Sequence, residues 1–307
     1  MFCGGGGSSL GASMAGVKIV GGAEMAEYPA RAFEANFPAA KLYKGDLRIL
    51  DLNRLRHDLG RINLLLASPE CTNHTCAKGS APRSEESKET ALQVIRFATA
   101  LQPDWIVLEN VVHMRPWKRY PEMKESLSAI GYTIAEVVLD SSLFGVPQKR
   151  RRLFMIAGLT KQARAVVGRT RVPKTAASVL DPDGSWPTTY LFLKGRAKGT
   201  LERAERAIAE VGTKTPFLLV YYGTDGAGGW QPLDQPLRTV TTIDRFALVE
   251  PSRSGHKMRM LQASELRRAM GFPGRYRFPA GTRRDKIKLL GNAVCPPVMR
   301  AIIESLT

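Results

Sequence analysis

The sequence is poor in cysteine and histidine, and the few that it has are not spaced as metal ligands or as a disulfide framework. The 307 residues include four cysteines and four histidines. No pair of them has the spacing of a zinc site, so we expect no metal. Unpaired cysteines are typical of a reducing compartment, and nothing at the N-terminus resembles a secretory signal. We therefore expect a cytoplasmic protein.

Acidic residues and long apolar runs are also scarce. Asp and Glu number 28 against 45 Lys and Arg, which gives a net charge of +17 and a pI near 10.0. Such a surplus favours a polyanionic partner, although a basic surface can also be simply solvated. The sequence has no apolar run long enough to span a membrane and no basic amphipathic helix. Among polyanions, it therefore favours nucleic acid over a membrane surface.

The first half of the chain alternates between helical and strand-like patterns. Strand-like apolar runs lie at 17–20, 64–67, 105–108, 133–139 and 153–156, and helical patterns at 10–14, 28–37 and 90–101. This alternation predicts βαβ units, and hence an α/β fold with a doubly wound, mostly parallel sheet. The polar stretch from Thr72 to Glu89 predicts a mobile surface loop.

The pattern loosens between residues 161 and 256, where proline and glycine separate short segments. Helical spacing then returns, and a final helix follows Val294. We therefore predict a main domain formed by residues 1–160 and 257–307, and a small mixed lobe formed by residues 161–256.

Several residues with useful chemistry follow the predicted strands. In open α/β sheets, ligands bind beyond the carboxyl ends of the strands. The glycines at 4–7, Glu24, Asp46, Cys71 and Glu109 are all expected there. A glycine loop followed by an acidic residue one strand later is typical of nucleotide-containing cofactors, whose ribose hydroxyls the carboxylate binds. The alternatives are a flexible glycine tail and surface carboxylates on turns.

Cys71 and Glu109 form a candidate catalytic pair. Cys71 follows a buried strand and a proline, and Glu109 ends the next predicted strand, 38 residues later. A lone cysteine in such a place is often only a small buried apolar residue, but glutamate is seldom buried without a task. Arg150 and Arg152 alternate on an entering strand and so point the same way. A guanidinium there favours the thiolate of Cys71 and orients Glu109, and the alternative is a solvated basic turn.

These motifs resemble, in order and over nearly the full chain, those of the DNA cytosine-5 methyltransferases. The residues that carry the resemblance are Phe2-Cys3-Gly4-Gly5-Gly6-Gly7, Ser68-Pro69-Glu70-Cys71, Glu109-Asn110-Val111, Gln148-Lys149-Arg150-Arg151-Arg152, the segment from Arg259 to Pro273, and Gly291-Asn292-Ala293-Val294. Each motif is short, but six in the right order are specific.

The resemblance implies a Rossmann-like domain that transfers a methyl group from S-adenosylmethionine to carbon 5 of cytosine in DNA. Cys71 would attack carbon 6 of a flipped-out cytosine, Glu109 would be the acid at ring N3, and Arg150 or Arg152 would grip the cytosine O2. The segment from Thr72 to Glu89 would close over the base. The products would be methylated DNA and S-adenosylhomocysteine.

The resemblance also implies which residues bind the cofactor and the DNA. Expected cofactor contacts are Phe2, Cys3, Gly4, Gly6, Gly7, Glu24, Met25, Asp46, Leu47, Pro69, Asn292 and Ala293. Expected DNA contacts are Asn110, Gln148, Thr239 and Thr241, the two threonines in a Thr-x-Thr element of a target recognition domain at 161–256. We expect a monomer that acts on double-stranded DNA, with a restriction endonuclease for the same site as a companion.

This sequence departs from the family pattern at three places. Glu70 stands where proline usually precedes the nucleophile, and Thr72 stands where glutamine usually follows it. We expect the Glu70 side chain to face away or to pair with a cation, because a carboxylate beside Cys71 would raise the pKa of the thiol. The strand and the aspartate that usually precede the glycine loop have no counterpart, which indicates a truncated start or weakened cofactor binding. Two alternatives remain open: a methyltransferase for cytosine in transfer RNA, and a non-catalytic DNA-binding relative.

Overall fold

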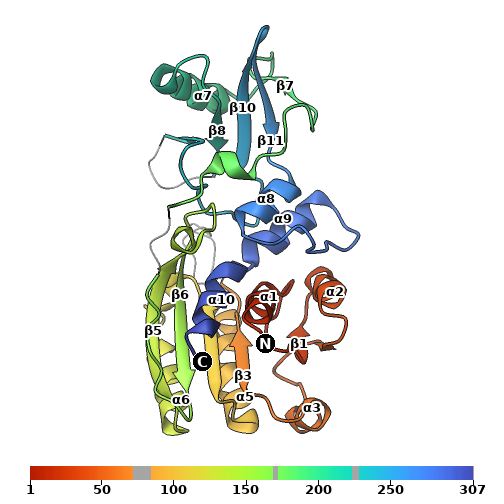
Figure 1. Ribbon diagram of the computed structural model, residues 1–307, viewed down its shortest axis with the longest axis vertical. Coiled ribbons are helices and arrows are strands. Elements are labelled where there is room, and N and C mark those ends of the chain that lie inside the picture. The colour runs from red at the N-terminus through yellow and green to blue at the C-terminus, as the bar shows by residue number, and fades with distance from the viewer. Residues whose placement is uncertain (72–83, 169–171, 223–227, 307) are drawn as a thin grey trace.

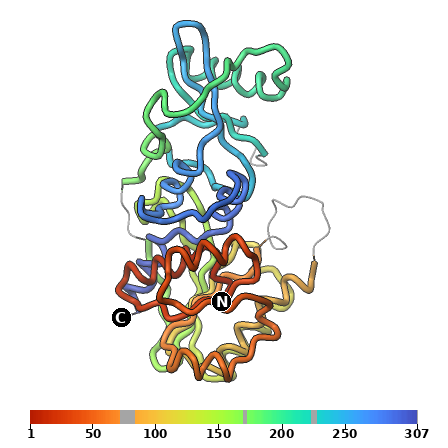
Figure 2. Tube along the Cα trace, turned by 90° about the vertical axis from the view of Figure 1, so that its right-hand side faces the viewer, coloured from red at the N-terminus to blue at the C-terminus, as the bar shows by residue number. Residues whose placement is uncertain are grey.

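The computed structural model describes residues 1–71, 84–168, 172–222 and 228–306. The molecule is elongated, with a lower lobe built mostly from the N-terminal half and an upper lobe around a second β-sheet (Figure 1). Both chain ends lie in the lower lobe, and C-terminal segments run through the junction between the lobes (Figure 2). Among the described residues, no helix combines the length and the apolar character needed to cross a membrane.

The lower lobe contains two sheets with helices around them. Its strands are β1 (Gly21–Glu24), β2 (Lys41–Lys44), β3 (Leu64–Ala67), β4 (Trp105–Asn110), β5 (Thr133–Asp140) and β6 (Arg151–Gly158). Its helices are α1 (Gly7–Met14), α2 (Glu27–Asn36), α3 (Leu52–Leu59), α4 (Glu85–Glu89), α5 (Gln93–Leu101), α6 (Tyr120–Ala129) and α10 (Pro296–Glu304).

The four-stranded sheet is buried on both faces, because alternate residues of its central strands enter two different clusters. Ile106 and Leu108 of β4 pack among residues of α3, α5 and α6. Val107 of β4 and Phe154 of β6 pack on the opposite side with residues of α1 and α10. Burial on both faces explains why β4 is an unbroken apolar run, and it confirms the doubly wound α/β class.

Strand direction differs in part from the mostly parallel sheet that we predicted. β1 pairs with β2 and β3 pairs with β4 in parallel, but β6 lies between β4 and β5 and is antiparallel to both. The connection from β5 to β6 is short, so the chain turns back alongside the strand that it has just left. The sheet of order β3-β4-β6-β5 is therefore mixed.

Two local predictions also need correction. The strand predicted at 17–20 begins only at Gly21, because the Val17 N–H bonds back to the Ala12 carbonyl at the end of α1, and the first bond toward β2 is from Lys41 to the Val20 carbonyl. Part of the loop predicted at 72–89 is the helix α4, whose first turn is capped by the Ser84 side chain. Residues 72–83 lie outside the described part of the chain.

The upper lobe is an antiparallel sheet with one helix packed on it. The order is β7-β11-β10-β8-β9, formed by β7 (Thr189–Tyr190), β8 (Phe217–Val220), β9 (Trp230–Pro232), β10 (Phe246–Ser252) and β11 (Gly255–Met260). The helix α7 (Lys198–Val211) buries alanine side chains against β8. β11 continues through Met260, so the sheet reaches four residues beyond the boundary at 256 that the sequence indicates.

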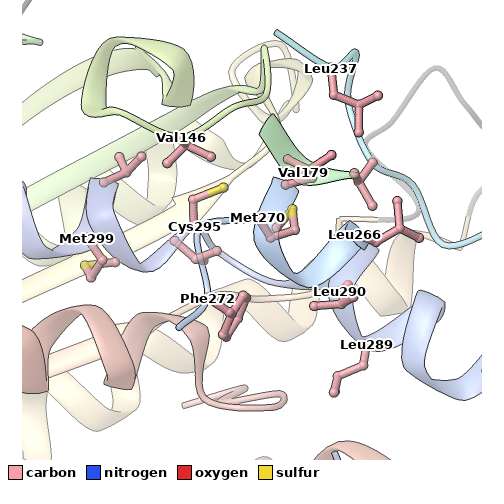
Figure 3. Close-up of a cluster of buried hydrophobic side chains, with 14 of the residues drawn as sticks. Val146, Val179, Leu237, Leu266, Met270, Phe272, Leu289, Leu290, Cys295 and Met299 are labelled. Atoms are coloured by element: carbon pink, nitrogen blue, oxygen red, sulfur yellow. The ribbon is translucent and has the colours of Figure 1, made fainter. Parts of the chain in front are cut away.

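A shared apolar cluster joins the two lobes. Leu237 from the upper part, Val146 from the β5–β6 connection, and Leu290 and Cys295 from the C-terminal segment belong to one buried group (Figure 3). The group also includes residues of α8 (Ala263–Ala269), α9 (Arg283–Asn292) and a short 3-10 helix (Ala176–Val179). Because this cluster is continuous with one face of the lower sheet, the upper lobe has a fixed attachment to the strand ends below it.

Candidate active site

Cys71 lies beyond the carboxyl end of β3, and Glu109 lies at the carboxyl end of the neighbouring parallel strand β4. Ala67, the last residue of β3, is in register with Leu108 of β4, so Glu109 lies one residue beyond the level at which the chain leaves β3. The Asn110 amide donates to the Pro69 carbonyl at 3.1 Å, which ties the segment that carries Cys71 to the end of β4. The structure therefore brings the thiol and the carboxyl to the same edge of the sheet, as the sequence predicts.

Burial and nearby charges shift the pKa values of both the Cys71 thiol and the Glu109 carboxyl. Burial raises the pKa of Cys71, the nearby Glu109 charge raises it further, and Arg152 and Arg150 lower it. Burial also raises the pKa of Glu109, whose residue is 6% exposed, against the lowering effect of the same two arginines. Glu109 is therefore held toward its protonated form, which is the form that donates a proton or a hydrogen bond.

The two arginines point to the same region, as their spacing predicts, but they have different partners. Arg152 Nε lies 3.3 Å from Glu109 Oε1, with both side chains largely buried. Arg150 donates to the carbonyls of Val240, Gly291 and Ala293 at 2.7–3.0 Å. Arg152 is thus the arginine in contact with Glu109, whereas the guanidinium of Arg150 binds backbone carbonyls of the upper and C-terminal segments.

Asn110 and Gln148 are interior residues, which corrects their expected contact with DNA. Asn110 is 1% exposed and Gln148 is fully buried. The Asn110 side chain bonds to Pro69 and to the Val111 N–H. The Gln148 side chain donates to the Ala269 carbonyl and accepts from the Val240 N–H. Both amides hold backbone segments in place and have no surface to offer to DNA.

Thr239 and Thr241 flank the backbone that Gln148 and Arg150 hold. Both are half-buried. The Thr239 hydroxyl donates to the Lys149 carbonyl at 2.9 Å, and the Thr241 hydroxyl donates weakly to the Ile243 carbonyl at 3.4 Å. The Thr-x-Thr element therefore lies next to the arginine segment, close to the ends of β4 and β6.

The glycine loop is packed closely on its inner side and open on its outer side. A Cβ at Gly7 would lie 2.5 Å from the Val294 carbonyl oxygen, so the loop and the closing Gly-Asn-Ala-Val segment are in tight contact. Gly4 has φ of +51°, and a Cβ there would meet no atom within 4 Å. The Gly4 N–H donates to Glu24 Oε2 at 2.8 Å. At Gly4 the loop thus offers a partly exposed backbone next to a carboxylate at the end of β1.

The other expected cofactor residues differ in exposure. Phe2, Cys3 and Ala293 are half-buried, Leu47 and Pro69 are buried, and Met25 and Asn292 are exposed. The hydrogen bonds that the Asp46 carboxylate accepts from the side chain and the backbone N–H of Arg48 hold its pKa below the ordinary value. The Arg48 guanidinium also reaches Glu86. The Glu70 side chain is exposed and its carboxylate accepts from the Ser87 hydroxyl, which is not the cation that the sequence suggested as one possible partner.

Two contacts at the glycine loop were not predicted from the sequence. The Tyr276 hydroxyl donates to the Gly5 carbonyl at 2.8 Å from 271 residues away. The hydroxyls of Ser8 and Ser68 are 3.3 Å apart and connect α1 to the segment that carries Cys71. The described residues contain no cluster of His, Cys, Asp or Glu suited to a metal ion.

Comparison with known proteins assigns this chain to a family. The profile of the C-5 cytosine-specific DNA methylases matches residues 1–307. The chain belongs to this family. It is a DNA cytosine-5 methyltransferase, so the sequence-based identification is confirmed.

Curated relatives of this methyltransferase cover most of its length. It is 28% identical over 299 residues to the Type II methyltransferase M.HgiDI of Herpetosiphon aurantiacus, an alignment that covers 96% of this chain and 88% of that protein. It is 23% identical over 311 residues to the Type II methyltransferase M.HaeII of Haemophilus aegyptius, with coverages of 100% and 91%.

Solved structures share the fold of this methyltransferase. A putative DNA modification methyltransferase from an Escherichia coli prophage superposes with a TM-score of 0.71 at 18% identity, covering 99% of this chain and 96% of that one. A DNMT2 protein of Spodoptera frugiperda has a TM-score of 0.73 at 18% identity, with the same coverages. At these identities the likeness shows the fold alone, which is the Rossmann-like methyltransferase fold that the sequence indicates.

Proposed function

We propose that this methyltransferase modifies carbon 5 of cytosine within a specific sequence of double-stranded DNA, with Cys71 as the nucleophile and Glu109 as the acid. The observation that carries the proposal is the meeting of these residues at the ends of β3 and β4, with Arg152 3.3 Å from the carboxyl. The net charge of +17 supports a polyanionic substrate.

In the proposed reaction, the Cys71 thiolate forms a bond to carbon 6 of the cytosine. The ring electrons shift toward N3, where Glu109 donates its proton, so that carbon 5 becomes nucleophilic. Arg152 binds the cytosine O2 and holds Glu109 in place. After carbon 5 has taken the methyl group, it loses its proton to a water molecule, Cys71 leaves carbon 6 as the thiolate, and the N3 proton returns to Glu109, which restores the aromatic ring. The target base must leave the duplex, because carbons 5 and 6 cannot be reached inside the stack.

S-adenosylmethionine is the methyl donor in this proposal, and the residues around the glycine loop fit it. The outer side of the loop is open at Gly4, and the Glu24 carboxylate beside it retains acceptor capacity for ribose hydroxyls. The exposed Met25 is available to cover one face of the adenine. Asp46 would accept a hydrogen bond from the adenine amino group, and its carboxylate would remain bound to Arg48 at the same time.

On the DNA side, we propose that Thr239 and Thr241 contact the substrate and that the upper lobe selects the sequence. The relatives are named Type II methyltransferases, and a companion endonuclease for the same site is part of this proposal. We propose that the enzyme acts as a monomer.

The test is methyl transfer from radiolabelled S-adenosylmethionine to duplex DNA of mixed sequence. Wild-type protein is expected to label the DNA, and Cys71→Ser is expected to abolish labelling while retaining DNA binding. Cys295→Ser is the matched control, because Cys295 is fully buried in the junction cluster and takes no part in the proposed reaction. Labelling by Cys71→Ser at the wild-type rate would refute the role of the thiol. Preferential labelling of transfer RNA would refute the proposed substrate.

A second experiment tests the covalent step. DNA that carries 5-fluorocytosine at the target position cannot lose a proton from carbon 5, so the enzyme should remain joined to it. We expect a denaturation-resistant complex with the wild-type protein and the donor, and none with Cys71→Ser. Peptide mapping must locate the adduct on Cys71, and an adduct on another residue would contradict the mechanism.

A further inference from the structure

Helix α4 contacts two separate segments of the candidate active site through consecutive residues. The Ser87 hydroxyl donates to the carboxylate of Glu70, which is the residue directly before Cys71. The neighbouring Glu86 carboxylate accepts from Arg48 Nη1 at 2.6 Å. One short helix therefore reaches both the segment of the nucleophile and the turn that carries Arg48.

Arg48 in turn holds the carboxylate that the proposed function assigns to the adenine group. Its Nε donates to Asp46 Oδ1 at 3.1 Å and to Oδ2 at 2.8 Å, and its backbone N–H donates to Oδ1 at 2.8 Å. Each carboxylate oxygen can accept more than one hydrogen bond, so an adenine amino group can bind while Arg48 fixes the orientation of the carboxylate. The guanidinium of Arg48 thus connects Asp46 to Glu86.

The backbone around Arg48 is fixed to the helix that follows α4. Arg96 of α5 donates to the carbonyls of Leu47 and Leu50, each at 2.8 Å. These two carbonyls lie on either side of Arg48 in the chain, so the Arg48 side chain extends toward α4 from an anchored turn. Coupling between sites is carried by such hydrogen-bond networks when they are joined to rigid elements.

Glu70 is one of the positions at which this sequence departs from the family pattern, and the structure gives it a partner. Proline, the usual residue at this position, has no side-chain acceptor and could not bind the Ser87 hydroxyl. A hydrogen bond to a carboxylate is stronger than one between two neutral groups. The departure at position 70 therefore creates a contact between α4 and the nucleophile segment.

We propose that α4 couples adenine binding at Asp46 to the position of Cys71. The positioning residues that make this connection, the α4 bridge, are Arg48, Glu86, Ser87 and Glu70. The inference rests on the proposed function, because adenine binding at Asp46 is part of it. Such coupling is reciprocal: if the bound cofactor holds the nucleophile segment in place, breaking the α4 bridge must also weaken cofactor binding.

The first test measures the binding of S-adenosylhomocysteine by calorimetry, without DNA or turnover. Ser87→Ala removes the hydroxyl that reaches Glu70, and it does not weaken the helix, because alanine is the better helix former. We expect about 3–5-fold weaker binding in Ser87→Ala and in Glu86→Gln, a size typical of exposed charged contacts. Ser87→Thr keeps a hydroxyl and should bind as the wild type does.

Glu89→Gln is the matched control for Glu86→Gln. It removes one charge and one ion pair from the same helix, but its partner is Arg119 at 2.7 Å, which is not part of the α4 bridge. We expect Glu89→Gln to bind the product with wild-type affinity. An equal loss in Glu89→Gln would show that the ion pairs of α4 act only on the helix itself, and it would overturn the coupling.

The second test measures the alkylation rate of Cys71 at saturating S-adenosylhomocysteine, read by peptide mass spectrometry. Alkylation of a half-buried thiol requires local opening of its segment, so the rate reports how firmly the segment is held. We expect alkylation to be about 3–5-fold faster in Ser87→Ala and in Glu86→Gln than in the wild type and in Glu89→Gln. The double variant should be no faster than either single variant, because each break interrupts the same connection.

The outcomes distinguish this inference from the proposed function. If the wild type binds the product and all the variants bind it equally well, the coupling is refuted and the proposed methyl transfer still stands. Additive effects in the double variant would also refute the coupling, since they would show two independent local contacts. If the wild type does not bind the product, the cofactor assignment of the proposed function is refuted, and the coupling with it.

Discussion

Arg152 lowers the pKa of both catalytic candidates, so its replacement makes a sharp prediction. The guanidinium Nε lies 3.3 Å from the Glu109 carboxyl, and its charge lowers the pKa of Glu109 and of Cys71. In Arg152→Met, both pKa values should rise. The proposed reaction needs Cys71 deprotonated and Glu109 protonated, so both limbs of the pH–rate profile should move toward higher pH.

The size of this shift follows from the distance and the burial. At 3.3 Å and an effective dielectric constant of about 20, two unit charges interact by roughly 5 kcal/mol, or nearly 4 pKa units. Relaxation of the site and the remaining charge of Arg150 reduce this, and an opposite charge at such a distance typically shifts a carboxyl by about 1–3 units. We therefore expect the limbs of kcat/KM against pH to move upward by about 1–3 units, with a loss of about 10²–10⁴-fold at neutral pH.

The assay combines the pH dependence of methyl transfer with the alkylation rate of Cys71, read by peptide mass spectrometry so that other cysteines do not interfere. Alkylation reports the thiolate without requiring turnover. Arg151→Met is the matched control, because Arg151 is exposed on the same strand and has no contact with Glu109 in the structure. A downward shift in Arg152→Met, or an equal shift in Arg151→Met, would refute the assignment of Arg152.

Three further predictions concern stability and are measured by equilibrium urea unfolding. Glu265→Gln should lower the free energy of unfolding by about 3–5 kcal/mol, because it leaves the buried Arg259 without its 2.7 Å carboxylate partner, and a change below 1 kcal/mol would contradict this. Gly7→Ala should lower it by about 1–3 kcal/mol, since the added methyl meets a backbone oxygen at 2.5 Å, and a stabilised variant would show that the loop can move aside. Leu290→Ala should lower the free energy of unfolding by about 2–5 kcal/mol, because Leu290 is fully buried in the junction cluster. Leu193→Ala is the control and should lower it by less than about 0.5 kcal/mol, because Leu193 is 52% exposed. Similar losses in the two variants would contradict the assigned core.

The sequence predicted the parts of the site that depend on strand order and residue type. Cys71 and Glu109 were expected at neighbouring strand ends because each follows an apolar run, and the parallel pairing of β3 and β4 brings them there. The burial of Glu109 was expected from its place in a core strand. Alternation also predicted that Arg150 and Arg152 point the same way, and both charges act on Glu109.

The sequence could not indicate partners that come from distant segments. Alternation gives the side to which Arg150 points, but the carbonyls that it binds lie 90, 141 and 143 residues away. Gln148 was expected to contact DNA because the family resemblance implied it, yet Gln148 is fully buried and its side chain donates to the Ala269 carbonyl of α8. The strand at 17–20 was misplaced because an apolar run indicates which residues pack in the interior. It does not indicate which residues pair with a neighbouring strand.

The segment from Gln148 to Arg152 connects the upper lobe to the chemistry through alternate residues. Gln148 accepts from the Val240 N–H and Arg150 donates to the Val240 carbonyl, each at 2.8 Å, so both backbone groups of one residue are held. Arg152, two residues further along the chain in β6, lowers the pKa of Glu109 against the raising effect of burial. Gly291 packs closely against the backbone that follows Val240, since a Cβ at Gly291 would lie 2.3 Å from the backbone carbonyl carbon of Thr241. This backbone therefore has no room to move toward Gly291. A displacement of the backbone at Val240 must therefore strain β6 or move it. β6 carries Arg152, whose charge lowers the pKa of Glu109.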